Sequence, residues 1–290
     1  MKTLIKHKFK LYWPLIKSLQ TALLLITGIT GYISAKCPAK NVNEFVIMTV
    51  ALFLTVSGST ILNMWYDRDI DAKMNRTKHR PLPSGELNPN EVLILGLIVS
   101  FVGLALAFSL SFIFGAVVFA GLFFDVVVYT IWLKRRTAWS IVWGGISGGM
   151  PILAGRALGL GHIDWIGILF SLAILLWIPT HILTFSMKYF EDYQAAGVPT
   201  FPSTYGNRKT RIIIALSSLG AAIAIATVAY GLGLSWGYLR LFAVLSIGIL
   251  GLAATSVYKP SERVNFGLFK YASLYMLGSM IMIIIGMMKG

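Results

Sequence analysis

The sequence is poor in charged residues and in cysteine. Only 12% of its 290 residues are Asp, Glu, Lys or Arg, and 57% are hydrophobic, whereas a soluble domain has about 25% charged residues. This deficit excludes a soluble globular fold and indicates an integral membrane protein. The single cysteine, Cys37, excludes a disulfide within the chain, and we interpret it as an inert small residue. The basic N-terminus leads into a full-length apolar run without a small-residue cleavage site, so we expect no cleavable signal peptide.

Long apolar runs are abundant. They extend over about 20 residues without strict alternation of polar and apolar positions, which is typical of membrane-spanning helices. A helix satisfies every backbone polar group within its own segment, as the interior of a bilayer requires. We therefore predict an all-α membrane protein formed by a single domain over residues 1–290. Its nine predicted transmembrane helices cover residues 14–34, 44–65, 91–110, 113–132, 140–159, 165–187, 212–233, 238–257 and 268–288.

Positive charge is distributed unevenly between the two sides that nine spans define. Twenty of the 25 Lys and Arg residues fall on one side: in the N-terminal segment, which ends with Lys17, and in the loops that follow the second, fourth, sixth and eighth predicted spans. Four fall on the other side, and Arg156 lies within a span. Because basic residues accumulate in cytoplasmic loops, we expect the N-terminus in the cytoplasm and the C-terminus outside the cell membrane. The asymmetry also accounts for the net charge of +14 without a nucleic-acid partner.

Acidic residues are few, 11 in all, yet three of them lie within five residues after the second predicted span. If the helix continues at 100° per residue, Asn63, Asp67 and Asp71 fall at about 0°, 40° and 80°, on one face. Asp69 falls at about 240°, facing away. Hard oxygen ligands on one face suit Mg²⁺, which binds one or two carboxylates together with substrate phosphates. The spacing therefore predicts a metal site on this face.

Two other interpretations apply to the same stretch. A solvated helix flank explains the basic residues, through the preference of Lys and Arg for the cytoplasmic side, but it does not explain aspartates beside anionic lipid. A calcium-binding EF-hand loop requires Gly at its sixth position and Glu at its twelfth, where this sequence has Ala72 and Lys78. We therefore reject the calcium loop. The cations downstream, which include Arg76 and Arg80, suit the oxygens of a phosphate group.

A second polar group marks the end of the sixth predicted span. On a continued helix His181, Lys188 and Asp192 lie within about 40° of one another, and Glu191 is offset from Lys188 by about 60° on the other side. The group either forms a solvated flank, with Lys188 reaching out of the bilayer, or presents a cation and a carboxylate to a site in the cytoplasmic loops. For His181, a hydrogen bond to a neighbouring helix and a place in the cavity are both open.

The fourth predicted span ends in Tyr129, Lys134, Arg135 and Arg136. These residues are either anchors that follow the charge rule for cytoplasmic loops or a clamp for phosphate oxygens. Both interpretations put them on the same side of the membrane as the three aspartates.

Three further features lie inside predicted spans. Asp125 either pairs with a cation or lines the cavity. Arg156, near the outer end of its span, is expected to extend its guanidinium group out to the membrane interface. The glycine-rich run 144–149 has small residues four apart, which favours close packing between helices.

Together these motifs resemble a known family. The first long loop carries a spacing similar to the N-x-x-x-D-x-x-x-D signature of the UbiA superfamily of intramembrane prenyltransferases. The segments NMWYDRDIDAKMNRTKHRPLPSGELNP, YTIWLKRRTAWSIVWGG and PTH…KYFEDYQAAGVP resemble its protoheme IX farnesyltransferase (heme O synthase) branch, over about residues 55–206. The resemblance implies nine helices around a central cavity, capped by the cytoplasmic loops 66–90 and 188–211. It also implies Mg²⁺-dependent loss of diphosphate from an allylic prenyl substrate.

The resemblance further implies roles for individual residues. The expected metal ligands are Asn63, Asp67, Asp71 and Asp192. The expected catalytic residues are Asp67, Asp71, Lys188 and Asp192. The residues expected to bind the diphosphate are Asn63, Arg76, Arg80, Tyr129, Lys134 and His181. In this scheme Arg76, Lys134 and Lys188 neutralise negative charge on the leaving group, and the apolar bundle keeps the allylic carbocation away from water.

By the same resemblance the acceptor is the vinyl group of heme b and the product is heme O. An aromatic quinone precursor and geranylgeranylglyceryl phosphate are the alternative acceptors. The implied partners are the prenyl diphosphate, the acceptor and membrane lipid, with contacts to heme-handling or oxidase-assembly proteins as a further expectation. Two other classes compete: a transporter, whose site would lie near the midplane on broken helices, and an assembly factor of a respiratory complex, which gives no reason for aspartates at helical spacing.

Overall fold

The computed structural model describes residues 10–35 and 41–289, and over these ranges it consists of helices and turns without a strand. Cys37 and five lysines of the charge count lie outside the described residues. The elements, in chain order, are η1 (Trp13–Ile16), α2 (Ser18–Ile33), α3 (Val42–Tyr66), α4 (Arg68–Asp71), α5 (Pro89–Leu110), α6 (Phe112–Leu122), η2 (Phe123–Leu133), α7 (Ser140–Leu160), α8 (Trp165–Lys188), α9 (Phe190–Ala195), α10 (Phe201–Gly231), α11 (Trp236–Tyr258) and α12 (Glu262–Lys289).

Within the described residues, each of the nine predicted spans corresponds to a helix or to a pair of helices in succession. Ser111 has an extended backbone and separates α5 from α6, where the sequence predicts the break between the third and fourth spans. Two helices begin well before their predicted starts. α12 begins at Glu262, and α10 begins at Phe201 because Thr200 caps it and Pro202 fits its first turn.

Seven of the described helices are long and apolar enough to cross a membrane when α6 and η2 are counted as one continuous helix. η1 and α2, which are bent by 44° at Lys17, provide an eighth when they are taken as one broken span. α7 is not among them, because its glycines, Pro151 and Arg156 lower its hydropathy. It nevertheless has 21 residues, the length that a span requires. The chain is a multi-pass, all-α membrane protein.

The second half of the fourth span is a π-helix, η2, which follows directly on α6. The sequence predicts an ordinary α-helix there. A π-helix bonds each N–H to the carbonyl five residues earlier, as the Lys134 N–H does to the Tyr129 oxygen at 2.8 Å. π-helical turns are rare in proteins overall, but those that occur are often found at functional sites. The altered register changes which side chains of this span face α3.

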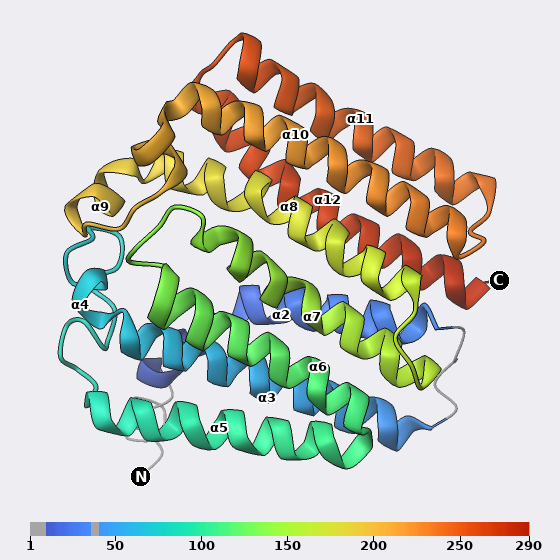
Figure 1. The fold of residues 1–290 in the computed structure, drawn as a ribbon, viewed down its shortest axis with the longest axis horizontal. Coiled ribbons are helices and arrows are strands. Elements are labelled where there is room, and N and C mark those ends of the chain that lie inside the picture. Colours follow the sequence, from blue (N-terminus) through green and yellow to red (C-terminus); the bar gives the residue numbers. More distant parts are fainter. Residues whose placement is uncertain (1–9, 36–40, 290) are drawn as a thin grey trace.

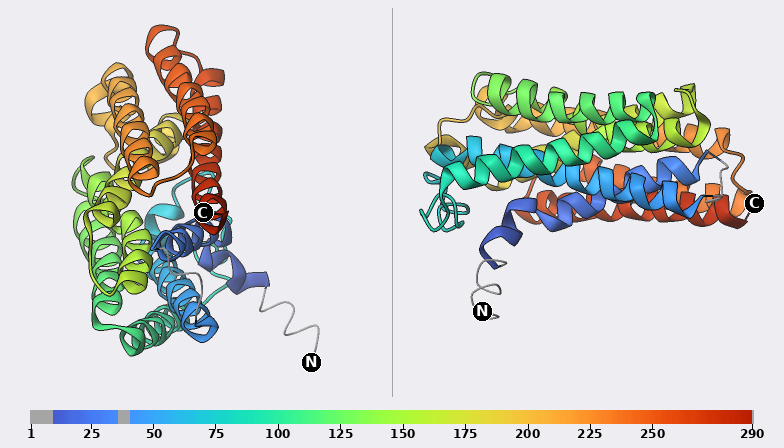
Figure 2. Two further views of the ribbon diagram at one scale, coloured as in Figure 1. Left: turned by 90° about the vertical axis from the view of Figure 1, so that its right-hand side faces the viewer. Right: turned by 90° about the horizontal axis from the view of Figure 1, so that it is seen from below.

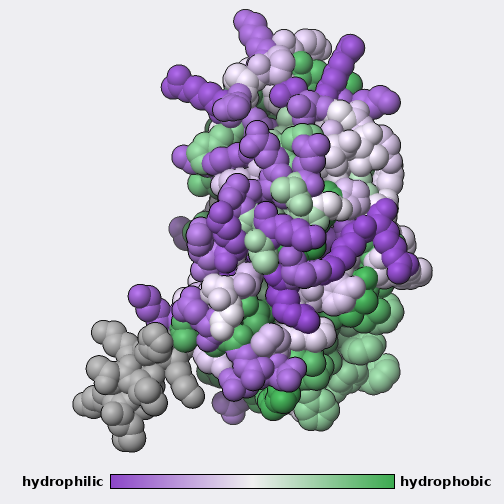
Figure 3. Space-filling view, turned by 90° about the vertical axis from the view of Figure 1, so that its left-hand side faces the viewer, coloured by the Kyte–Doolittle hydropathy of each residue, from purple (hydrophilic) through white to green (hydrophobic). Residues whose placement is uncertain are grey.

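The long helices lie side by side along the long axis of the molecule, and Figure 2 shows the bundle from two further directions. α4 and α9 lie together at one end, and the C-terminus of α12 lies at the other (Figure 1). Hydrophilic side chains cover much of the end that carries α4 and α9 (Figure 3). The fold therefore brings the two polar groups of the sequence to the same end of the bundle.

The glycine-rich part of α7 packs closely against α8. A methyl group added to Gly145 would lie 2.5 Å from a side-chain carbon of Leu175, and one added to Gly148 would lie 2.7 Å from a carbon of Ile178. Larger residues would push the two helices apart, so the predicted packing role of this run is confirmed.

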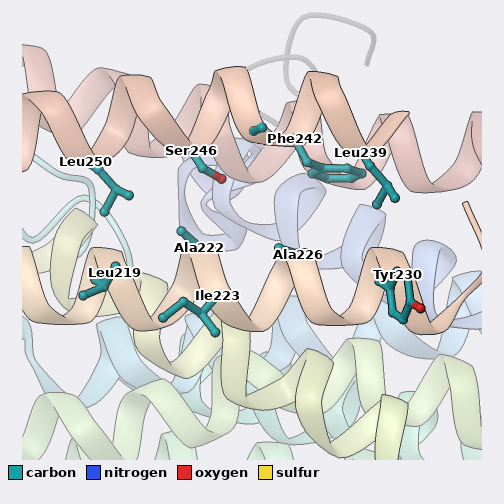
Figure 4. A pocket seen from close by; sticks show the side chains of 10 residues that line it. Leu219, Ala222, Ile223, Ala226, Tyr230, Leu239, Phe242, Ser246 and Leu250 are labelled. Atoms are coloured by element: carbon teal, nitrogen blue, oxygen red, sulfur yellow. The ribbon is translucent and has the colours of Figure 1, made fainter. Parts of the chain in front are cut away.

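Apolar side chains form much of the outer surface of the bundle. Phe101 and Ile247, for example, are 74% and 70% exposed. A shallow apolar groove of about 380 Å³ lies between α10 and α11, with Leu219 and Leu250 among its lining residues (Figure 4). A hydrocarbon environment suits such a surface, because apolar groups exposed to water would be unfavourable.

Candidate active site

The aspartate face is formed where α3 passes into α4. Asp67 has φ −84° and ψ 2° and ends the regular part of α3. The four-residue hydrogen-bond spacing nevertheless continues, because the Asp67 N–H donates to the Asn63 carbonyl at 2.9 Å and the Asp71 N–H to the Asp67 carbonyl at 2.8 Å. Asn63, Asp67 and Asp71 are all buried, whereas the side chain of Asp69 is 58% exposed. The predicted division into one shared face and one outward aspartate is confirmed.

Each of the three residues on this face contacts a different cation. Lys17 Nζ donates to Asn63 Oδ1 at 2.9 Å. Lys134 Nζ forms an ion pair with Asp67 Oδ2, and Arg80 Nη1 lies 3.0 Å from Asp71 Oδ2. The structure therefore brings together five predicted site residues, Asn63, Asp67, Asp71, Arg80 and Lys134, and adds Lys17.

One buried carboxylate oxygen on this face receives no hydrogen bond from the described residues. Asp67 Oδ1 is buried without a hydrogen-bond partner in the described part of the chain, and Arg135 Nη2 lies 3.8 Å from it. Buried polar atoms normally have partners, so a free carboxylate oxygen indicates a ligand position. Asp67 and Asp71 can offer oxygens to Mg²⁺, which completes its shell with phosphates and water. No cluster of three or more His, Cys, Asp or Glu side chains that could hold a metal unaided exists among the described residues.

Lys17 is a site residue that the sequence analysis missed. Its backbone is in the left-handed region, at φ 45° and ψ 57°, a conformation that is uncommon outside glycine. Lys17 stands at the 44° bend between η1 and α2. The bend directs its ammonium group to α3, whereas the sequence analysis counted Lys17 only among the basic residues of the N-terminal segment. The sequence feature that could have indicated this role is a lysine three residues after Pro14, at the start of an apolar run.

The π-helix η2 supplies the other side of the site. Thr130 Oγ1 accepts a hydrogen bond from Asn63 Nδ2 at 2.8 Å, and Lys134 directly follows the helix. The Lys134 ammonium group lies over the ring of Tyr129, 5.6 Å from the ring centre. The Asp125 carboxylate accepts a hydrogen bond from the Ser59 hydroxyl of α3, and its place in the cavity stays a prediction.

Asp69 and Arg135 form an ion pair on the outer side of α4. Arg135 nitrogens donate to the two Asp69 oxygens at 2.6 and 2.7 Å, and Arg135 also donates to the Tyr66 carbonyl at 2.8 Å. The hydrogen bonds from Arg135 lower the pKa of Asp69, although burial opposes the change. This pair joins the end of the π-helical span to α4 and does not face Asn63.

Asp192 lies on a different helix from His181 and Lys188. α8 ends at Lys188, and Tyr189, at φ −108° and ψ 35°, separates it from α9. The prediction of one continuous helical face through Asp192 is therefore wrong. The Asp192 carboxylate instead accepts hydrogen bonds from the backbone N–H groups of Asn75, at 2.9 Å, and Arg76, at 3.3 Å. It ties the two predicted capping loops together.

Arg76 and Lys188 lie against aromatic rings at the end of α8. The Arg76 guanidinium is 5.0 Å from the ring centre of Phe185, and the Lys188 ammonium is 3.8 Å from that of Phe266 on α12. Both residues line a cleft of about 700 Å³ that Asp192 also borders. The structure thus groups them with Asp192, whereas Lys134 and Arg80 are the predicted cations that contact the aspartate face.

His181 contacts α12 from within α8. Its ring stacks between Trp177 and Phe269, with ring centres 5.1 and 4.5 Å away, and it shares a hydrogen bond of 3.2 Å with the Ser273 hydroxyl. This is the hydrogen bond to a neighbouring helix that the sequence left open. Glu191 is exposed, as a solvated flank would be.

Arg156 does not extend to the membrane interface, so that prediction is wrong. It is 5% exposed and donates to both oxygens of Asp164, at 2.8 and 2.7 Å. It also donates to the Ser34 carbonyl at 2.6 Å. Gly161, at φ +79°, reverses the chain after α7 and brings Asp164 back over Arg156.

The fold and the aspartate face point to one class of protein, the intramembrane prenyltransferases. The chain matches the UbiA prenyltransferase family over residues 24–275, so the match extends beyond the segment that carried the resemblance. The chain belongs to the UbiA prenyltransferase family.

Within that family the chain is similar to a protein of Archaeoglobus fulgidus named protoheme IX farnesyltransferase, with 39% identity over 92% of this chain and 94% of the relative. Its fold is similar to a solved structure concerned with digeranylgeranylglyceryl phosphate synthase, with a TM-score of 0.81 and 22% identity over 98% and 100% of the two chains. It is also similar to a UbiA homologue from Archaeoglobus fulgidus bound to GPP and Mg²⁺, with a TM-score of 0.66 and 16% identity over 95% and 98%.

Proposed function

We propose that this chain transfers a farnesyl group from its allylic diphosphate to the vinyl group of heme b and so produces heme O. The name of the relatives that are similar over nine-tenths of the chain supports the choice of donor and acceptor. The observation that carries the proposal is the buried face of Asn63, Asp67 and Asp71 with cations at each residue. Such a face suits a metal-bound diphosphate and serves no evident packing purpose.

Asn63, Asp67 and Asp71 would hold Mg²⁺ on this face. When bound, the ion neutralises charge on the diphosphate and makes it a better leaving group. The free Asp67 oxygen is the position best suited to such a ligand. Asp192 was predicted as a further ligand, but its bonds to the Asn75 and Arg76 N–H groups favour a role in closing the loops over the site.

The cations of the site stabilise the charge that develops as the allylic C–O bond breaks. Lys134, Arg80 and Lys17 already stand at the aspartate face, so they can donate to diphosphate oxygens without a large rearrangement. Arg76 and Lys188 extend the positive charge along the neighbouring cleft. The acceptor vinyl group then attacks the allylic carbocation, and the cation that this leaves beside the porphyrin ring is quenched by water, which adds as a hydroxyl group and releases a proton. The apolar bundle keeps water away until the new C–C bond has formed.

Burial of the prenyl tail provides the binding energy for the donor. Each buried CH₂ group contributes about 0.8 kcal/mol, so a farnesyl chain gains on the order of 10 kcal/mol before the entropic cost of binding. The end of the bundle that carries α4 and α9 would face the cytoplasm, with the N-terminus on the same side. Diphosphate could then leave directly into water.

The experiment that tests the proposal offers the purified protein several substrates in parallel. The donors are farnesyl and geranylgeranyl diphosphate, and the acceptors are heme b, 4-hydroxybenzoate and geranylgeranylglyceryl phosphate. Products are identified by mass. We expect a farnesyl adduct of heme b that requires Mg²⁺. Transfer only to an aromatic or a glycerol phosphate acceptor would overturn the heme assignment, and no transfer to any acceptor would overturn the enzymatic proposal.

A further inference from the structure

Thr130 lies in the π-helix and is fully buried. Its Oγ1 donates to the backbone carbonyl of Asp125 at 2.7 Å and accepts from Asn63 Nδ2 at 2.8 Å. A hydroxyl group has a single proton, and here Asp125 takes it. Thr130 can therefore only accept from Asn63, which requires the NH₂ end of the Asn63 amide to face it.

Lys17 imposes the same orientation from the other end of the amide. An ammonium group donates and cannot accept, and Lys17 Nζ lies 2.9 Å from Asn63 Oδ1. A flipped amide would set its NH₂ group against the Lys17 ammonium and its oxygen against the Thr130 oxygen. Both contacts would be repulsive, so the two neighbours together select one orientation of Asn63.

The π-helix makes the Thr130 contact possible. In an α-helix a threonine hydroxyl bonds the carbonyl three or four residues before it, whereas Thr130 bonds that of Asp125, five residues before. Asp125 is itself tied to α3 through the Ser59 hydroxyl. A third hydrogen bond runs from the Tyr66 hydroxyl of α3 to the Ile131 carbonyl of η2 at 3.3 Å. Thr130 is thus one of three points at which η2 and α3 are joined.

We propose that Thr130 is a positioning residue that holds the Asn63 amide with its oxygen directed to the cation side of the aspartate face. The inference rests on the proposed function, in which Asn63 is a ligand of the Mg²⁺–diphosphate complex. An amide oxygen can bind a metal cation, but an amide NH₂ group cannot. Without Thr130 only Lys17 selects the orientation, the Asn63 NH₂ group loses its acceptor, and metal-dependent binding of diphosphate weakens.

The test measures binding of inorganic pyrophosphate to the purified full-length protein over a range of Mg²⁺ concentrations. Thr130→Val keeps the shape of the side chain and removes the acceptor. We expect the dissociation constant to rise on the order of 10-fold, as is common when a group that orients a metal ligand is lost. The Mg²⁺ concentration for half-maximal binding should rise as well. Thr130→Ser keeps the hydroxyl and should bind within about 2-fold of the wild type.

Thr30→Val is the matched control. Thr30 is equally buried, and its hydroxyl donates to a carbonyl of its own helix, that of Ile26, at 2.8 Å. This variant should bind pyrophosphate like the wild type. If Thr130→Val does not give folded protein, Thr130→Cys, close in size to serine but a weak acceptor, replaces it, with a smaller rise expected.

The outcomes separate the two proposals. A wild-type protein that does not bind pyrophosphate with Mg²⁺ contradicts the proposed function. A wild-type protein that binds it, together with a Thr130→Val or Thr130→Cys variant that binds equally well, overturns the positioning role alone. A loss in Thr130→Ser as large as that in Thr130→Val also overturns it, because serine retains the accepting oxygen.

Discussion

Two buried ion pairs lie at opposite ends of the bundle, and they differ in how completely they are satisfied. At the end away from α4 and α9, both oxygens of Asp164 accept from Arg156, and Oδ1 also accepts from the Gly167 N–H at 2.9 Å. At the other end, Asp67 pairs with Lys134 through Oδ2, and its Oδ1 is buried without a hydrogen bond from any residue that the structure describes. We call Arg156–Asp164 the closed pair, because both carboxylate oxygens accept hydrogen bonds. We call Lys134–Asp67 the open pair, because one carboxylate oxygen is left for a ligand.

The difference indicates which pair serves the fold and which serves the chemistry. A buried polar group without a partner costs about 1–3 kcal/mol, so the protein is less stable with Asp67 as it stands than with a satisfied network. Arg156 instead uses its donors to join α7 to the Ser34 carbonyl at the end of α2. We infer that Asp164 and Arg156 hold the helices together and that Asp67 and its neighbours hold a ligand.

The largest expected effect is at the open pair. Asp67→Ala and Asp71→Ala should each lower the rate of prenyl transfer on the order of 10³-fold, because each removes an oxygen that stabilises the metal-bound leaving group. Thermal unfolding should show that both variants fold. Wild-type rates in either variant, measured at saturating Mg²⁺, would contradict the metal role of that residue.

A substitution in the closed pair should change the stability of the protein instead of the rate of prenyl transfer. Arg156→Met leaves the Asp164 charge without its partner and should lower the free energy of unfolding by about 3–5 kcal/mol. Activity per folded molecule should stay near the wild-type value. Unfolding measured in detergent and a titration of active sites separate the two quantities. An Arg156→Met protein of unchanged stability would mean that the pair is not structural.

The pH dependence of stability gives a finer test of the closed pair. Burial alone would raise the pKa of Asp164, but hydrogen bonds from Arg156 and the Gly167 N–H lower it below its ordinary value of 3.8 overall. A lowered pKa in the folded state means that ionised Asp164 stabilises the protein above that ordinary value, and the contribution is lost as the pH falls through the folded pKa. Wild type should be more stable than Asp164→Asn at pH 7, and the difference should narrow below pH 3.8.

The smallest expected effect is at Asp69, which belongs to the same motif but faces away from the site. Its exposed pair with Arg135 is screened by water and salt. Asp69→Ala should therefore reduce the transfer rate by only a few-fold, because an exposed ion pair contributes little free energy. Rates of the purified variant, compared with those of Asp67→Ala, provide the check. An equal loss in both would remove the distinction between the two faces of α4.

The sequence predicts the helices and the aspartate face because both depend on local spacing. Apolar runs of about 20 residues predict spans, and 100° per residue puts Asp67 and Asp71 together. It does not predict the contacts that depend on local breaks in the helices. The left-handed backbone at Lys17, the π-helix around Thr130 and the break at Tyr189 each redirect a side chain, and no periodic pattern contains them.

Manganese binding tests the central claim most directly, because Mn²⁺ can replace Mg²⁺ at oxygen sites and is detected by its paramagnetic resonance. Binding of Mn²⁺ in the presence of pyrophosphate is measured for the wild type, Asp67→Asn and Asp164→Asn. We predict that wild type and Asp164→Asn bind the ion and that Asp67→Asn loses the binding. Equal binding by Asp67→Asn and the wild type would contradict the assignment of the open carboxylate as the metal ligand.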